Sequence, residues 1–206
     1  MKTNSRLIHT GTALLVFLLF LSLGSGAAQQ KAAPAALKAG LPVLLTSCGQ
    51  SPGPTTFEIF LKQLKLDFES KLDATPGDLA RGGAPFKSLI IVTGASLKGM
   101  GAAGVSIEDE LARIKALIAA ARKQNIKVIG AHIEGMKRRA QGASPGDNSD
   151  ELTIDAVCPE SAILIIKKEG DEDGRFTTIS KSKGIPMISY EKNMELKNVL
   201  ESVFAK

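Results

Sequence analysis

The sequence predicts a single doubly wound α/β domain with about five parallel strands. Five short runs of apolar, mostly branched residues recur along the chain, and each run is followed by a polar or glycine-rich loop. Runs that are apolar throughout are typical of strands buried on both faces of a sheet. Apolar residues at helical spacing lie between these runs, so strand and helix alternate, which favours a parallel sheet covered by helices on both faces.

The predicted strands occupy residues 42–47, 88–94, 127–133, 162–168 and 186–190. We assign them the flavodoxin-like order 2-1-3-4-5, within the broader Rossmann-like class, because it is common among doubly wound domains. In that order the segment 127–133 lies beside the segment 42–47, and the segment 88–94 lies at the edge of the sheet.

The helix patterns place apolar residues three or four positions apart, as one buried helix face requires. They run from Phe57 to Phe68, from Ile107 to Ala121 and from Leu196 to Val203. Thr55 with Glu58 has the spacing of a capping box, and Ser106 precedes two acidic residues, so we expect helices to begin at both places.

Residues 1–28 have the pattern of a secretory signal peptide. Lys2 and Arg6 precede the apolar run 13–23, and small residues follow it up to an alanine pair where cleavage is expected. The run of 11 residues is too short to span a membrane, which takes about 20. We therefore predict a secreted or periplasmic protein with no stable membrane anchor after signal cleavage.

Residues 29–40 are predicted to form a mobile N-terminus of the mature chain, and residues 41–206 to form one α/β domain. The end of the first strand, "LLTSC", is similar to a lipoprotein cleavage site at Cys48. About two dozen residues separate it from the apolar run 13–23, so the apolar residues before Cys48 fit a strand better than a signal, and lipid attachment is not predicted.

Charge and composition argue against a nucleic-acid partner. The chain carries a net charge of +5, and two of its basic residues, Lys2 and Arg6, belong to the predicted signal. It has no Trp and one Tyr. A protein that binds nucleic acid typically has a basic face with aromatic side chains on which bases stack. The sequence shows neither, and a small molecule is the expected partner.

The two cysteines are predicted to be free thiols. Cys48 follows the first strand, whereas Cys158 precedes the fourth, which places them at opposite edges of the sheet. A strand of five residues is about 17 Å long. A disulfide needs Cα atoms within about 7 Å of each other.

The candidate ligand site lies at the carboxyl edge of the sheet, where open α/β sheets bind ligands. Its predicted residues come from the loop after residues 42–47 and from the loop after residues 127–133. They are Ser47, Cys48, Gly49, Gln50, Ser51, His132, Arg138, Arg139, Ser149 and Asp150.

The first loop is glycine-rich and opens a helix, which suits an anion because free backbone N–H groups point out of a helix start. In the second loop, Arg138 and Arg139 could grip a carboxylate or phosphate with two hydrogen bonds each. The stretch 136–149 shows no periodicity, so we expect either a lid or a disordered segment. A solvent-exposed basic loop without a ligand is the alternative.

A thiol-dependent hydrolase or transferase is the competing hypothesis. Cys48 lies near a predicted helix start, which can lower the pKa of a thiol, and His132 could serve as its base with Glu134 orienting the ring. Against this, a lone cysteine at a strand end is most often a packed apolar group, and Pro54 occupies the arginine position of the phosphatase pattern C-x5-R.

Neither a cofactor nor a metal ion is predicted. Gly49 and Gly53 have the wrong spacing for a P-loop, and no Trp is available to stack on a flavin. Asp171, Asp173 and Gly174 are similar to part of a calcium loop, but no Glu follows at position 12, so capping of a helix explains the acidic run better.

Four stretches together resemble an uncharacterised family of exported bacterial proteins that is known only as a domain of unknown function. They are "LLTSCGQSPG", the strand ending in His132 with Arg138, Arg139, Ser149 and Asp150, "GDEDGRF" and "KGIPMISY". The resemblance covers residues 41–204. It implies that these loops form one site, and it supplies no activity.

Three classes of function remain open at this point. Binding of a small anionic ligand is favoured by the glycine-rich loop and the basic loop. A thiol-dependent enzyme would use Cys48 and His132. A partner-binding structural domain would show an exposed apolar patch.

Overall fold

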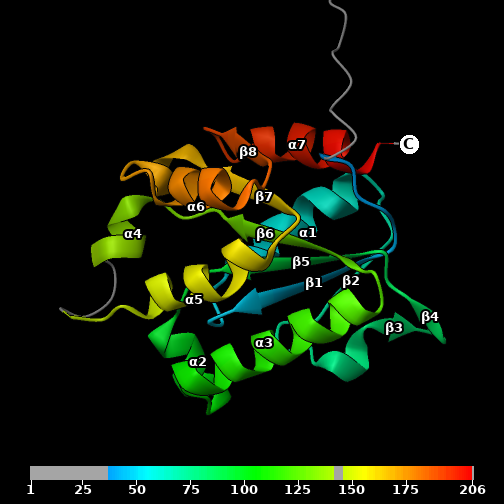
Figure 1. The fold of residues 1–206 in the computed structure, drawn as a ribbon, viewed down its shortest axis with the longest axis horizontal. Helices are drawn as coiled ribbons and strands as arrows, with labels where there is room; N and C mark the ends of the chain where they lie inside the picture. Colours follow the sequence, from blue (N-terminus) through cyan, green and yellow to red (C-terminus); the bar gives the residue numbers. More distant parts are fainter. Residues whose placement is uncertain (1–36, 142–145, 206) are drawn as a thin grey trace, which may run out of the picture. The chain divides into compact units, whose positions relative to one another are not determined.

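The computed structural model describes residues 37–141 and 146–205. Its main sheet has six strands, all parallel, in the order β2-β1-β5-β6-β7-β8 (Figure 1). The strands are β1 (Val43–Cys48), β2 (Phe68–Ser70), β5 (Ser88–Thr93), β6 (Lys127–His132), β7 (Ile163–Lys167) and β8 (Met187–Tyr190). A separate antiparallel pair is formed by β3 (Ala80–Arg81) and β4 (Ala84–Pro85). The prediction of a doubly wound α/β domain is confirmed.

The helices connect successive strands and cover both faces of the main sheet. They are α1 (Gly53–Gln63), α2 (Leu97–Ala103), α3 (Ile107–Lys123), α4 (Met136–Gln141), α5 (Ser149–Val157), α6 (Arg175–Lys183) and α7 (Glu195–Phe204). Short 3-10 turns occupy Pro76–Asp78, Cys158–Glu160 and Lys168–Asp171.

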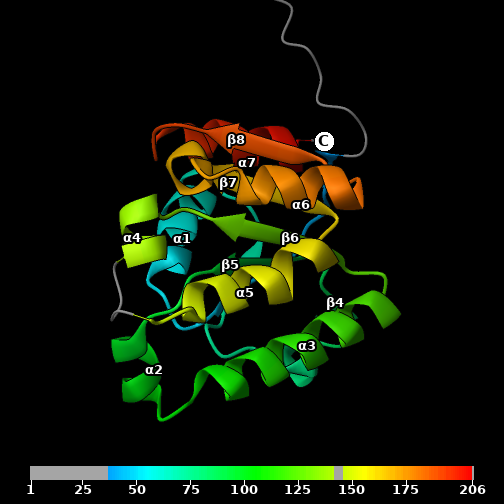
Figure 2. The ribbon, with the colours of Figure 1, turned by 60° about the vertical axis from the view of Figure 1, so that its left-hand side comes forward.

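Alternate residues of the buried strands face two separate layers of helices. Val43 and Leu45 of β1 pack with α1 and α7 on one face. Leu44 and Cys48 lie on the opposite face, which α3 covers at this end of the sheet. Helices α5 and α6 continue that second layer over β7, and Figures 1 and 2 show α3 and α5 running side by side.

The order 2-1-3-4-5 does describe the first five strands of the sheet in chain order, but the prediction took the wrong segment as the second strand. That strand is β2, at the edge of the sheet beside β1, and not the segment around β5. β5 lies between β1 and β6, so β6 is not a neighbour of β1. The signal was weak because β2 has three residues, Phe68, Glu69 and Ser70, of which none is buried.

Of the two predicted helix starts, one lies where it was predicted and the other lies two residues earlier. Ser106 forms the expected capping box at the start of α3, with Asp109 as its partner. α1 begins at Gly53, two residues before Thr55, without a side-chain cap.

The stretch 136–149 contains more regular structure than predicted. α4 begins at Met136 and α5 begins at Ser149. Neither helix was expected, and residues 142–145 between them lie outside the described part of the chain.

Residues 37–40, expected to belong to a mobile N-terminus, pack on the domain. Leu37 and Ala39 contact the core, and the Ala39 N–H donates a 2.9 Å hydrogen bond to the carbonyl of Val203 in α7. The predicted signal, residues 1–28, lies outside the described residues. Within residues 37–141 and 146–205, no helix is long and apolar enough to cross a membrane.

We predict that Gly130→Ala destabilises the protein by about 1–3 kcal/mol, the usual cost of overpacking a core. An added Cβ at Gly130 would lie 2.5 Å from Ser161 Oγ and 3.1 Å from Leu164 Cδ2. Gly101→Ala is the control, because Gly101 is exposed inside α2 with open space around it and should gain up to about 1 kcal/mol. Urea unfolding measures both; equal effects would contradict the packing described for β6.

Candidate functional site

The carboxyl edge of the sheet has its topological switch point between β1 and β5. The order reverses there, since β2 follows β1 in the chain but lies on its outer side. Ligands of open α/β sheets bind at such a point. The loops that flank it are the one after β1, as predicted, and the one after β5 (residues 94–96), which was not predicted to belong to the site.

These two loops are joined to each other through their backbones. Gln50 forms an isolated antiparallel bridge with Ala95, and the Ser96 N–H donates a 2.7 Å hydrogen bond to the Gly49 carbonyl. Gly49 has a φ of +97°, and a Cβ there would lie 2.6 Å from the Gly94 carbonyl oxygen. Only glycine permits this approach, so Gly49 serves the contact between the two loops.

The backbone of the first loop already binds a carboxylate of the protein itself. Glu110 of α3 is 2% exposed, and its Oε2 accepts a 2.9 Å hydrogen bond from the Gly49 N–H. Its Oε1 accepts a 3.1 Å hydrogen bond from Gln50 Nε2. The predicted anion position at this loop is therefore occupied by an internal group.

Arg113 neutralises Glu110 and extends the network to three further segments. Its guanidinium contacts the Glu110 carboxylate at 2.7 Å and donates 2.8 Å hydrogen bonds to the carbonyls of Ala74 and Ser47. Burial alone would raise the pKa of Glu110, but the hydrogen bonds from Arg113 and Gly49 and the charge of Arg113 leave that pKa below its ordinary 4.5.

Two residues of α5 complete the carboxyl edge in the same way. The Asp150 carboxylate accepts a hydrogen bond from the Ala95 N–H, and Thr153 Oγ1 accepts one of 3.2 Å from the Gly94 N–H. Ser149 and Asp150 therefore do lie at the edge that carries Gly49, as predicted. Both are buried, and the side chain of Asp150 binds backbone.

Arg139 is held by internal partners on several sides. Its Nε donates a 2.8 Å hydrogen bond to Glu151, and its Nη1 donates one of 2.5 Å to the Gly170 carbonyl. Asp173 accepts from both Nη atoms, and the guanidinium lies 5.5 Å from the centre of the Phe176 ring. Arg139 thus connects α4 to α5 and to the start of α6. The side chain of Arg138 lies outside the described part of the structure.

Cys48 and His132 face the same side of the sheet, but Thr93 lies between them. Cys48 pairs with Thr93 in the register of β1 and β5, and β6, which carries His132, is the strand beyond. Strands two places apart in a sheet are roughly 9–10 Å apart. The predicted base is therefore not within hydrogen-bonding reach of the thiol.

Both groups of the predicted dyad are neutral at neutral pH. Cys48 is fully buried, and its burial raises the pKa of the thiol to about 12. Burial and the charge of Arg139 lower the pKa of His132 to about 4. The thiol and the imidazole have no ionic form to exchange under ordinary conditions, which does not favour the enzyme hypothesis.

The ring of His132 has one nitrogen bound and one unbound among the described residues. The Thr93 hydroxyl donates to the Ala131 carbonyl at 3.0 Å, so His132 Nδ1 donates to Thr93 Oγ1 at 3.0 Å. Nε2 has no partner in the described part of the chain, and the Phe176 ring stacks 5.1 Å from the imidazole. The ring is therefore held between Thr93 and Phe176.

Both cysteines are free and buried, as predicted. The acidic run after β7 caps a helix: Asp171 accepts hydrogen bonds from the Phe176 N–H at 2.7 Å and from the Thr177 hydroxyl at 2.5 Å. Within residues 37–141 and 146–205, no group of three or more His, Cys, Asp or Glu side chains could hold a metal ion.

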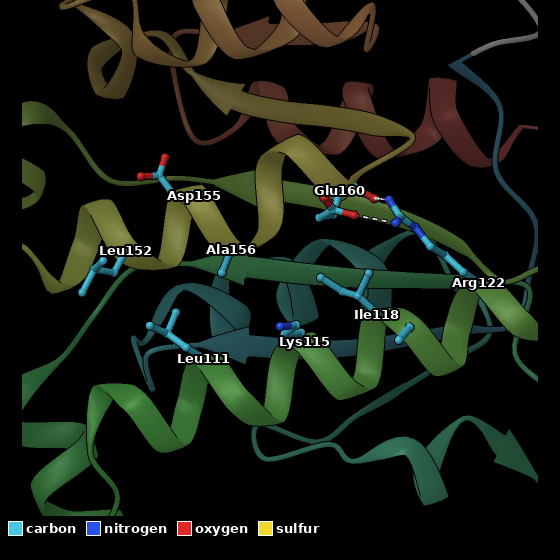
Figure 3. Close-up of a pocket in the computed structure, with 9 residues that line it drawn as sticks. Leu111, Lys115, Ile118, Arg122, Leu152, Asp155, Ala156 and Glu160 are labelled. Carbon is cyan, nitrogen blue, oxygen red and sulfur yellow. Dashed lines mark hydrogen bonds and ion pairs between the residues drawn. The ribbon is translucent and has the colours of Figure 1, made fainter.

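A groove of about 560 Å³ lies between α3 and α5, on the face of the domain away from α1 and α7 (Figure 3). This groove was not predicted from the sequence. Apolar and charged side chains both line it: Leu111, Lys115, Ile118, Ala119, Arg122, Leu152, Asp155, Ala156 and Glu160.

The two ends of the groove differ in character. Leu111 and Leu152 lie at the end where both helices begin, as Figure 3 shows. At the other end, Arg122 spans the gap to Glu160, with a 2.5 Å ion pair and a 2.9 Å hydrogen bond to the Glu160 carbonyl. The groove is therefore apolar at one end and polar at the other.

The spacing of α3 contained a signal for the groove. Leu111, Lys115, Ile118 and Arg122 follow each other at intervals of four, three and four residues, which puts them on one helix face. Two of them were assigned to the core stripe on the same spacing. Without a prediction of α5, no partner helix was available to form the opposite wall.

A family of conserved domains matches this chain over residues 40–204, and its description is "Domain of unknown function (DUF6305)". The chain belongs to this family. The match covers the whole α/β domain from the residue before Leu41 to the end of α7 at Phe204. No curated protein and no solved structure shows a significant match. The resemblance inferred from the sequence is confirmed, and the family carries no activity with it.

We predict that neither cysteine reacts with 5,5′-dithiobis(2-nitrobenzoate) while the DUF6305 domain is folded. Both thiols are fully buried, and the raised pKa of Cys48 leaves almost no thiolate at pH 8. Both should react after unfolding in guanidinium chloride, which serves as the control. Fast reaction of one thiol in the native protein would contradict this account and revive the enzyme hypothesis.

Glu110→Gln should lower the free energy of unfolding at pH 7 by about 3 kcal/mol, because it leaves Arg113 without its buried partner. The folded pKa of Glu110 is below its ordinary value of 4.5, so its stabilisation is present above that pH and is lost as the pH falls through the folded pKa. Urea unfolding of parent and variant should therefore converge in acid.

Glu108→Gln is the matched control for that variant, because Glu108 is exposed in the same first turn of α3. A surface change of this kind usually stays within about 0.5 kcal/mol. A Glu110→Gln variant as stable as Glu108→Gln at pH 7 would show that the buried carboxylate does not hold the first loop.

Proposed function

We propose that this DUF6305 protein is an exported binding protein for a small molecule, and that the molecule lies in the groove between α3 and α5. The groove carries the proposal, because its volume of about 560 Å³ falls within the range of about 300–1,000 Å³ that is typical of ligand pockets. Five of its nine lining side chains are apolar and four are charged, and ligand pockets commonly combine apolar walls with a small number of polar groups. N-terminal sequencing of exported protein, expected to start near residue 29, tests the export part.

Binding of an anion at the carboxyl edge, as expected from the sequence, stays a prediction. It would require the Gly49 and Ala95 N–H groups to exchange Glu110 and Asp150 for a ligand. Removing a carboxylate from a buried hydrogen-bonded position costs several kcal/mol. The groove needs no such exchange, and we therefore place the ligand there.

The two alternative classes have less support. A thiol-dependent enzyme needs a reactive Cys48, whose burial raises the pKa of the thiol to about 12. A partner-binding surface needs a contiguous apolar patch, whereas the large exposed apolar residues lie on separate elements. These are Ile59 in α1, Leu72 after β2, Leu97 in α2 and Met194 before α7. Scattered apolar residues of this kind are normal on a protein surface.

We predict that Ala119→Trp abolishes ligand binding without unfolding the protein. Ala119 lines the groove and is exposed, so an indole there fills the space while the core stays intact. The assay is thermal unfolding against a panel of alkyl carboxylates, dicarboxylates, phosphates and sugars. A ligand at a hundredfold excess over its Kd adds about 2.7 kcal/mol of stability, which shifts the melting temperature.

Ala116→Trp is the control, because Ala116 is an exposed residue of α3 that does not line the groove. It should keep every shift that the parent shows. The proposal fails if no compound of the panel shifts the melting temperature. It also fails if the two tryptophan variants bind equally well.

A further inference from the structure

The groove between α3 and α5 contains one charged side chain that has no ion-pair partner among the residues that the structure describes. Four charged residues line it, namely Lys115, Arg122, Asp155 and Glu160. Arg122 and Glu160 pair with each other at one end. Asp155 pairs with Arg175 of α6 at 2.6 Å, and Figure 3 shows its carboxylate turned away from the groove.

Lys115 is the remaining charge. Its ammonium group forms no ion pair or side-chain hydrogen bond with any residue in the ranges 37–141 and 146–205. Its helix offers it none, because an ion pair along a helix needs an acidic residue three or four positions away. Those four positions hold Leu111, Ala112, Ile118 and Ala119.

The position of Lys115 within the groove sets where a ligand charge would lie. It is one turn from Leu111 and about two turns, or roughly 10 Å, from Arg122. Both directions along the groove from Lys115 are walled by apolar side chains. Those that α3 and α5 contribute are Leu111, Ile118, Ala119, Leu152 and Ala156.

We propose that the groove binds a singly charged amphipathic anion, such as an alkyl or acyl chain that ends in one carboxylate. The headgroup pairs with Lys115, and the apolar chain lies along the facing sides of α3 and α5. This rests on the proposed function and specifies the ligand class of the same groove. A compact dianion or a sugar would leave the apolar walls uncovered, and a cation would meet Lys115 with the same sign of charge.

The charge at Lys115 distinguishes this ligand from a purely apolar one. The ammonium group is exposed, and ion pairs in such positions contribute up to about 1 kcal/mol, or about fivefold in Kd. The chain contributes more, because each fully buried methylene adds up to about fourfold in affinity. Affinity should therefore rise steeply with chain length and modestly with the negative charge.

The test uses calorimetric titration of the purified protein with octanoate, decanoate and decanol. We expect decanoate to bind more tightly than octanoate and about fivefold more tightly than decanol. Lys115→Gln should weaken decanoate about fivefold and leave decanol unchanged, and the difference should shrink at high salt. Lys123→Gln is the control, because Lys123 is an exposed residue of the same helix outside the groove and should change nothing.

The outcomes separate this inference from the proposed function. Equal binding of decanoate and decanol, both abolished by Ala119→Trp, keeps a ligand in the groove and overturns the role of Lys115. Equal effects of Lys115→Gln and Lys123→Gln overturn it too. No binding of any probe in this set or in the wider panel overturns both proposals. A dimer that Ala119→Trp dissociates would make the groove a contact between two copies of the chain, and would also overturn both.

Discussion

The buried carboxylate of Glu110 is the interaction on which the rest of this structure depends. A buried carboxylate is costly unless it is paired and hydrogen-bonded, so Arg113 and the Gly49 N–H must meet it in one arrangement. Together with the buried apolar residues Ile114 and Leu117, Glu110 turns one face of α3 toward the sheet. With Glu110 directed at the sheet, the face that carries Leu111 and Lys115 turns toward α5. The hydrogen bonds of Glu110 at the carboxyl edge and the α3 wall of the groove therefore require the same orientation of α3.

The buried strands could be predicted because burial of their own side chains stabilises them. Every residue of β1 and β5 is buried, and a run of apolar residues indicates that directly. β2 has only three residues and is held in the sheet by its pairing with β1. Its own residues therefore show no strand pattern. The same holds for α5, in which the buried residues include Ser149, Asp150 and Thr153. Polar residues on a buried helix face lead to the prediction of a loop, because the sequence does not show which backbone groups they bind.

Part of the predicted site does come together, but the hydrogen bonds that its residues form could not be predicted. Gly49, Ser149 and Asp150 do come together at the carboxyl edge, because parallel strands bring their following loops to one side of the sheet. The groups that satisfy them are far away in the chain. Gly49 binds Glu110 from 61 residues away, and Ala95 binds Asp150 from 55 residues away. A pattern of neighbouring residues does not reveal pairs so far apart in the chain. The sequence therefore does not distinguish a loop whose N–H groups bind another part of the protein from a loop whose N–H groups bind a ligand.

The hydrogen bonds at the carboxyl edge also hold one of the two helices that form the groove. α5 is held near its start by the hydrogen bonds of Asp150 and Thr153 to the loop after β5. Near its end it is held by Ser161, whose hydroxyl donates to the Val157 carbonyl at 2.8 Å, and by the pairing of Arg122 with Glu160. Both walls of the groove are thereby held by contacts within the protein. A ligand of the proposed kind would meet a preformed site, which avoids the ordering cost that a mobile lid would add.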